Sequence, residues 1–236
     1  MTIQLRSKNP DWQVGPHGSG TKGPRGLMYL ITDRWRWVAA SVIGLLVVSI
    51  AIVVYFAWNS KKETDSAILL RKAVSLLGTD TRSPQDSANP ANGLKIMHDV
   101  LSRYPGTAAA IEATLRLGAH YYAAGQYDEA RTVYVTYLNK NPRGQIAFTA
   151  GIGVGDTYLA QHSDEKAIET YSQLIEQFPQ EPLLPEAHLH LARAYRNANR
   201  LKDGLIIYEK IVATYPNTGW AQSAQAELYK VSLTPQ

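Results

Sequence analysis

One short segment recurs four times along the chain, as LSRYP at 101–105, YLNKNP at 137–142, LIEQFP at 174–179 and IVATYP at 211–216. The closing prolines are 37 residues apart each time. Each follows an apolar run with helical spacing and ends it, because the proline ring cannot continue a helix. A fixed period of this length predicts an array of helical repeats.

Three further classes of position keep the same 37-residue spacing. Two are tyrosines and one is a small residue: Tyr121, Tyr158 and Tyr195; Tyr134, Tyr171 and Tyr208; Gly93, Ala130, Ala167 and Gly204. Small residues allow two helices to approach closely, and aromatic rings fill the space between layers. These positions, like the Gly-rich run at 151–155, therefore predict packing and not a nucleotide-binding loop.

The pattern resembles the tetratricopeptide repeat (TPR) family, in which W-x2-L-G-x2-Y, A-x3-F and P lie on two antiparallel helices. The matching positions in the three full repeats are Leu117, Gly118, Tyr121, Ala130, Tyr134 and Pro142; Val154, Gly155, Tyr158, Ala167, Tyr171 and Pro179; Leu191, Ala192, Tyr195, Gly204, Tyr208 and Pro216. The Trp position holds Thr114, Gly151 and His188, and the period is 37 residues instead of 34. The resemblance implies an all-α TPR-type α-solenoid, and the uncharged apolar run ahead of it predicts one N-terminal transmembrane helix.

The TPR domain is expected over residues 59–236, with full repeats at 111–142, 148–179 and 185–216. Its ends are expected to be atypical, as in other solenoids. Residues 62–105 predict a degenerate first repeat, with one helix at 62–77 that Gly78 ends and a second at about 93–104. Residues 218–232 predict a capping helix.

Residues 37–58, WVAASVIGLLVVSIAIVVYFAW, contain no charge. At about 1.5 Å per residue this segment is roughly 33 Å long as a helix, which is enough to cross a bilayer. Aromatic residues stand at both ends, as is typical of membrane interfaces. The run is longer than the core of a signal peptide and bulky residues follow it, which favours a retained anchor. Its contacts would be with lipid and, through a small-xxx-small motif at Ala40 and Gly44, with another membrane helix.

Charge divides the chain unevenly. Residues 1–36 carry six basic and two acidic residues and are rich in Gly and Pro, which predicts a flexible basic tail. Residues 59–236 carry 18 residues of each sign, which argues against a nucleic-acid partner. Basic residues near the span are almost balanced, but the positive tail favours a cytoplasmic N-terminus and a periplasmic TPR domain at a bacterial inner membrane.

No pattern of residues predicts catalysis, a metal or a cofactor. The chain has no cysteine, which excludes disulfides and thiolate metal sites. His188 and His190 are two apart and point to different sides of a helix, so they cannot hold one metal together. No G-x-S-x-G, H-E-x-x-H or Walker sequence is present. We expect a protein that is not an enzyme.

The resemblance also implies a concave groove lined by the first helix of each repeat. The second, fifth, ninth and twelfth repeat positions face such grooves in the family. Here they are Glu112, Leu115, Ala119 and Tyr122; Thr149, Ile152, Asp156 and Leu159; Glu186, Leu189, Arg193 and Arg196. This mixture suits an extended peptide or partner helix. Arg193 and Arg196 are expected to hold a carboxylate or to form ion pairs with Glu186 or Asp203.

The order of tail, span and repeats is similar to that of the ancillary TPR subunit of the Sec translocon. The leading hypothesis is therefore a membrane-anchored scaffold or assembly factor that binds protein partners. The alternatives are a stoichiometric structural subunit of a respiratory or photosynthetic complex that holds an extrinsic subunit, and a cytosolic adaptor with the reverse topology.

Overall fold

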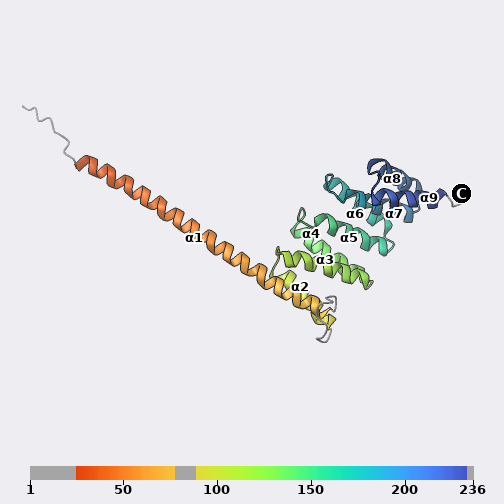
Figure 1. Ribbon diagram of the computed structural model, residues 1–236, viewed down its shortest axis with the longest axis horizontal. Helices are drawn as coiled ribbons and strands as arrows, with labels where there is room; N and C mark the ends of the chain where they lie inside the picture. The colour runs from red at the N-terminus through yellow and green to blue at the C-terminus, as the bar shows by residue number, and fades with distance from the viewer. Residues whose placement is uncertain (1–24, 78–88, 233–236) are drawn as a thin grey trace, which may run out of the picture. The chain divides into compact units, whose positions relative to one another are not determined.

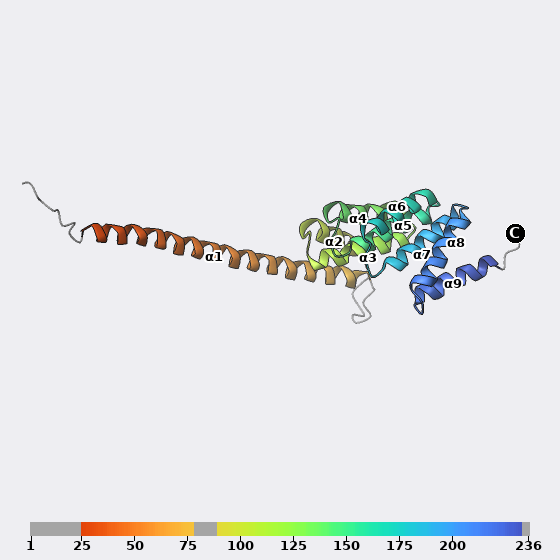
Figure 2. The same cartoon turned by 90° about the horizontal axis from the view of Figure 1, so that it is seen from above.

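The structure, a computed structural model, describes residues 25–77 and 89–232, with side chains from residue 35 onward. Within these residues the chain forms nine α-helices and no strand. They are α1 (Arg25–Leu76), α2 (Pro90–Arg103), α3 (Ala108–Ala123), α4 (Tyr127–Lys140), α5 (Ala147–Ala160), α6 (Asp164–Gln177), α7 (Leu184–Asn197), α8 (Leu201–Thr214) and α9 (Gly219–Ser232). The predicted all-α fold is confirmed (Figures 1 and 2).

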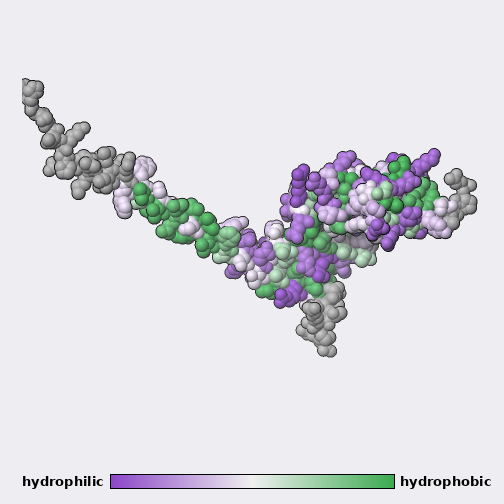
Figure 3. Space-filling model, turned by 45° about the horizontal axis from the view of Figure 1, so that its top comes forward, coloured by the Kyte–Doolittle hydropathy of each residue, from purple (hydrophilic) through white to green (hydrophobic). Residues whose placement is uncertain are grey.

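The chain divides into two units, residues 1–57 and 58–236. In the first, α1 contains a stretch with a mean hydropathy of 2.7, none of it buried by other parts of the chain, which makes it a candidate membrane span. Figure 3 shows the apolar surface along this part of the helix. Its hydroxyls are satisfied by their own helix: Ser41 Oγ donates to Trp37 O at 2.9 Å and Ser49 Oγ to Leu46 O at 2.8 Å. Such bonds remove the cost of a polar group in lipid.

Two boundaries differ from the sequence-based division. Helix α1 begins at Arg25, within the predicted tail, because the apolar run at 27–31 continues the helical pattern toward the N-terminus. The same helix runs to Leu76, so the predicted span and the predicted helix at 62–77 are one element. The proposed cap at Gly78 and most of the polar loop after it lie outside the described residues, as does the tail before residue 25.

In the second unit, consecutive helices pack as antiparallel pairs. The end of α1 packs with α2 through Leu70, Ala73, Met97 and Val100. The pairs α3–α4, α5–α6 and α7–α8 follow, and α9 packs on α8. Glu63 links the degenerate pair to the first full repeat, because its Oε2 accepts the N-terminal amide of α3, Ala108 N–H, at 3.2 Å.

The turns repeat along with the helices. Within the three full repeats, the residue between the two helices has a positive φ: Gly125 at 74°, His162 at 55° and Asn199 at 60°. These residues are 37 apart, and the left-handed conformation reverses the chain in each case. Thr107 and Thr218, three periods apart, each cap the following helix: Thr107 Oγ1 accepts Ala110 N–H and Thr218 Oγ1 accepts Ala221 N–H, both at 3.2 Å.

The glycines of the first helices are packing residues, as predicted. A Cβ on Gly118 would lie 2.1 Å from the ring of Tyr134, and one on Gly155 would lie 2.3 Å from the ring of Tyr171. Tyr171 and Tyr208 are fully buried between the layers. The periodic residues therefore form the core, and the groove must be built from the positions between them.

Candidate protein-binding groove

The first helices of the repeats form one continuous layer. Helix α3 contacts α5, α5 contacts α7, and α7 contacts α9. The second helices α4, α6 and α8 pack behind them. Helix α9 occupies the place of a fourth first helix, so it belongs to the groove-forming layer and is more than an end cap.

The structure places most of the predicted groove residues at the surface. Four are exposed: Glu112, Ala119, Tyr122 and Thr149. Six are half-buried: Leu115, Asp156, Leu159, Glu186, Arg193 and Arg196. The remaining two correct the expectation of exposure. Ile152 and Leu189 are 8% and 5% exposed, because Ile152 packs into the α5–α6–α7 core and Leu189 into the core formed with α8 and α9.

Aromatic rings mark one end of this surface. Tyr122 remains 40% exposed and makes an edge contact with Tyr127, with ring centroids 5.3 Å apart. Partial burial raises the pKa of Tyr122, and the charge of Asp156 and the Tyr127 hydroxyl raise it further. The hydroxyl therefore stays protonated and can donate a hydrogen bond at physiological pH.

A carboxylate held from two sides lies at the centre. Tyr171 Oη donates to Asp156 Oδ1 at 2.6 Å, and His190 Nδ1 lies 2.7 Å from the same oxygen. Burial raises the pKa of Tyr171, and Asp156 raises it further, so the tyrosine is the donor. The Asp156 side chain is 26% exposed, and no hydrogen bond engages its Oδ2 within the described residues. Asp156 is thus held through one oxygen and has the other available as an acceptor.

A cationic segment follows on α7. Arg196 forms an ion pair with Glu227 of α9, and Lys230 Nζ reaches the other oxygen of Glu227 at 2.9 Å. Burial raises the pKa of Glu227, but the hydrogen bond from Lys230 and the charge of Arg196 outweigh it, so the net pKa is lowered. The expected pairs with Glu186 or Asp203 are wrong, because α9 supplies the partner of Arg196 and Asp203 pairs with Arg200 at 2.9 Å.

Two polar groups near the groove have no hydrogen-bond partner among the described residues. Arg193 is half-buried, and no hydrogen bond or ion pair engages its guanidinium there. The hydroxyl of Tyr208 is buried and has no partner there either. The charge of Arg193 acts to lower the pKa values of Tyr171, Tyr208 and Glu227.

Sequence reasoning missed three residues that position the polar groups of this groove: Tyr171, His190 and Glu227. Tyr171 was assigned to the core alone, although its hydroxyl donates to Asp156 on α5. His190 could have been found, since it stands three residues before Arg193 and thus on the same helical face. Glu227 is 37 residues after His190, so the period itself marks the position.

Among residues 35–77 and 89–232, no three His, Asp or Glu side chains gather as a metal ion would require. His188 is buried and bonded to Leu184 O at 2.9 Å, while His190 faces Asp156. The first helices present the Tyr122 hydroxyl on α3, the Asp156 carboxylate on α5 and the Arg193 guanidinium on α7.

The antiparallel helix pairs and the continuous layer of first helices define a helical-repeat fold. Residues 115–182 and 154–217 match the tetratricopeptide repeat family, which supports the assignment of these helix pairs as TPR. No curated protein matches the chain.

Among solved structures, a double mutant of MamA RS-1 is 18% identical with a TM-score of 0.51, covering 72% of this chain and 86% of that one. A putative kinesin light chain from Podosopora anserina is 14% identical with a TM-score of 0.51, covering 73% and 85%. MamA from Desulfovibrio magneticus RS-1 is 18% identical with a TM-score of 0.49, covering 68% and 82%. At these identities the likeness concerns the fold alone.

Proposed function

We propose that the chain is a non-enzymatic, membrane-anchored scaffold or assembly factor that binds protein partners in its TPR groove. One observation carries the proposal. Asp156 on α5 and Arg193 on α7 occupy equivalent positions, one 37-residue period apart, on neighbouring first helices, and no hydrogen bond or ion pair engages Asp156 Oδ2 or the Arg193 guanidinium within the described residues. A backbone or side chain of an extended partner could satisfy both.

The candidate span supports the anchored part of the proposal. A helix of this apolar character would hold the groove at a membrane surface and raise its effective concentration for membrane-associated clients. The short basic tail favours a cytoplasmic N-terminus, with the TPR domain on the periplasmic side of a bacterial inner membrane. The similarity of plan to the ancillary Sec translocon subunit is consistent with this assignment and remains a prediction.

The alternative is a stoichiometric structural subunit of a large membrane complex, whose TPR domain holds an extrinsic subunit. Mild-detergent extraction of native membranes, followed by size separation and mass spectrometry, distinguishes the two. Substoichiometric recovery with varied clients supports the assembly factor. Constant co-migration with one set of subunits supports the structural subunit.

A groove variant makes that experiment specific. Arg193→Glu reverses the charge of the unpaired guanidinium and should reduce the recovered partners by about tenfold or more, because like charge then faces the partner. Lys202→Glu makes the same charge change at an exposed position of α8 and should leave recovery unchanged. Equal recovery with both variants contradicts use of the groove. A reporter fused after Gln236 tests the topology, since a cytoplasmic signal would assign the reverse orientation.

A further inference from the structure

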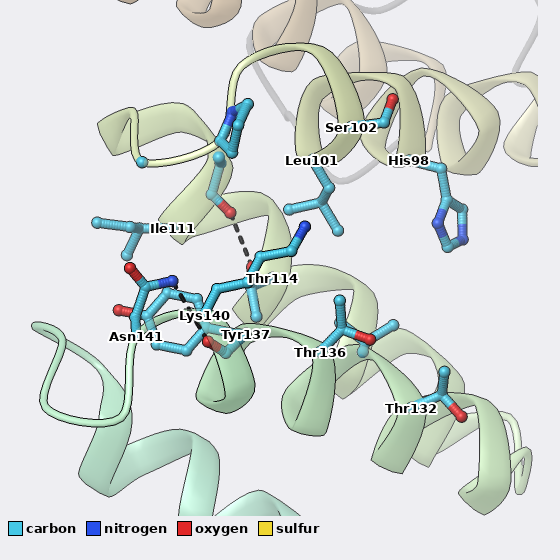
Figure 4. A pocket seen from close by; sticks show the side chains of 14 residues that line it. His98, Leu101, Ser102, Ile111, Thr114, Thr132, Thr136, Tyr137, Lys140 and Asn141 are labelled. Atoms are coloured by element: carbon cyan, nitrogen blue, oxygen red, sulfur yellow. Dashed lines mark hydrogen bonds between the residues drawn. The ribbon is translucent and has the colours of Figure 1, made fainter.

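A cavity lies between the second helices α2 and α4, with α3 as its floor (Figure 4). Its volume is about 290 Å³, and most of its surface is apolar, from Leu101, Pro105, Ile111, Val133 and Tyr137. On α3 it uses positions 110, 111 and 114, whereas the groove uses 112, 115, 119 and 122. Successive helical residues turn by about 100°, so the two sites occupy different faces of α3.

The same hollow recurs one repeat later. A second cavity of about 270 Å³ lies between α4 and α6 over α5. Its lining is displaced by the repeat length: Leu101 corresponds to Leu138, Pro105 to Pro142, and Thr114 to Gly151. The helical-repeat geometry therefore generates the cavity, and the side chains at its rim decide what can enter.

The two rims differ in charge. The first cavity is lined by Lys140 and His98 and by no carboxylate. In the second, the residues at these positions are Gln177 and Val135, and Gln177 Nε2 donates across the mouth to Pro142 O at 3.2 Å. No hydrogen bond or ion pair engages Lys140 within the described residues, and it reaches from α4 toward α2 (Figure 4). His98 is bonded to Tyr121 Oη at 2.9 Å. Lys140 is thus the free charge of this rim.

We propose that the first cavity is a second docking site, which takes one large apolar side chain of a partner peptide with an adjacent carboxylate placed against Lys140. The volume of about 290 Å³ is at the lower end of the range for small-molecule sites, about 300–1,000 Å³, and leaves room for one large side chain. Charge complementarity selects an acidic segment, since Lys140 faces no carboxylate. One anchor in an apolar pocket with a charged contact at its rim is a common arrangement at protein interfaces.

The test uses the full chain in detergent micelles and a fluorescently labelled peptide, GSEWESG, followed by fluorescence anisotropy. Two control peptides, GSQWQSG and GSEAESG, remove the carboxylates or the indole. We expect GSEWESG to bind, GSEAESG to lose binding, and GSQWQSG to bind roughly two- to fivefold more weakly, as for an exposed ion pair. Lys140→Gln should weaken GSEWESG by the same factor and leave GSQWQSG unchanged.

Matched variants separate this cavity from other surfaces. Thr136→Trp places an indole in the first cavity from an exposed position and should abolish binding of GSEWESG. Gln173→Trp places an indole in the second cavity from the equivalent position and should leave binding of GSEWESG unchanged. Lys202→Gln should also leave binding unchanged, because Lys202 is an exposed residue of α8 that lines neither cavity. Absence of GSEWESG binding at millimolar peptide overturns the proposal. So does an equal loss with Lys202→Gln, or binding of free 3-phenylpropionate without binding of the peptide.

Discussion

The second and third full repeats share one backbone geometry but differ in the polar groups around their buried tyrosines. In the second full repeat, the buried Tyr171 donates to Asp156, which also contacts His190. In the third, the same three positions hold Tyr208, Arg193 and Glu227, each 37 residues later. There the tyrosine hydroxyl has no partner, and Glu227 pairs with Arg196 instead of Arg193.

Comparing these two repeats distinguishes the residues that the fold needs for packing from the polar groups that line the groove. Both layers need a buried aromatic ring between the helices, and both have one. The tyrosine hydroxyl donates a hydrogen bond in the second repeat but has no partner among the described residues in the third. The ninth residue of the repeat is aspartate in the second repeat and arginine in the third, so the groove differs while both repeats keep a buried tyrosine.

The largest expected loss of stability is the same in both repeats and comes from removing the buried ring. Tyr171→Ala and Tyr208→Ala each remove a fully buried ring and should each lower the free energy of unfolding by about 3–5 kcal/mol. Urea denaturation of the full chain in detergent, followed by far-ultraviolet circular dichroism, measures both. A small loss at either position would mean that the corresponding ring is not a packing element.

Removing only the tyrosine hydroxyl should change the free energy of unfolding differently in the two repeats. Tyr171→Phe takes the donor from Asp156 and should cost about 1.5–3 kcal/mol, the range for hydrogen bonds to charged groups. Tyr208→Phe removes a buried group that has no partner and should be neutral or stabilising. The same denaturation experiment gives both values. Equal losses would show that Tyr208 is hydrogen-bonded in solution.

The small residue of the first helix that packs against the tyrosine ring gives a third comparison between the two repeats. Gly155→Ala puts a Cβ 2.3 Å from the ring of Tyr171 and should cost about 1–3 kcal/mol through overpacking, despite the better helix propensity of alanine. The third repeat already has Ala192 at this position, fully buried. Gly219→Ala, where nothing lies within 4 Å, is the control and should cost nothing. A neutral Gly155→Ala would indicate that Tyr171 can shift freely.

The smallest expected effect depends on pH and is confined to the third repeat. Burial lowers the pKa of His188, although its bond to Leu184 opposes the shift, and Lys210 lowers it further. The unfolded chain therefore binds the proton more readily, so this residue should destabilise the fold as pH falls below about 6.5. His188→Gln should reduce the loss of melting temperature between pH 7.5 and 5.5. An unchanged pH profile would mean that other groups control the acid response.

The sequence determines the helical pairs because the period records packing that every repeat must satisfy. The 37-residue period alone places Gly118, Gly155 and the core tyrosines. The pairing of Arg196 with Glu227 could not, since it joins residues 31 apart that meet only when α9 completes the layer. Burial of Ile152 and Leu189 depends on neighbouring pairs in the same way. A periodic pattern predicts which face of a helix a residue lies on. It does not predict how far the next helix pair buries that residue.

The same limit applies to the boundary of the first helix. The charge-free run at 37–58 indicates a span, but nothing in hydropathy alone says that α1 begins at Arg25 and continues to Leu76. Continuation depends on the absence of Gly and Pro between the span and Leu76, which is a local signal of helix propensity.

Site-specific photo-crosslinking in native membranes tests the central claim most directly. A photoreactive residue at Leu159, in the groove, is compared with one at Glu209, on α8 outside it, at equal expression. Groove binding predicts a discrete crosslinked partner from Leu159, none from Glu209, and loss of the Leu159 product in the Arg193→Glu background. No product from Leu159, or the same product from both positions, would contradict a groove that binds protein partners.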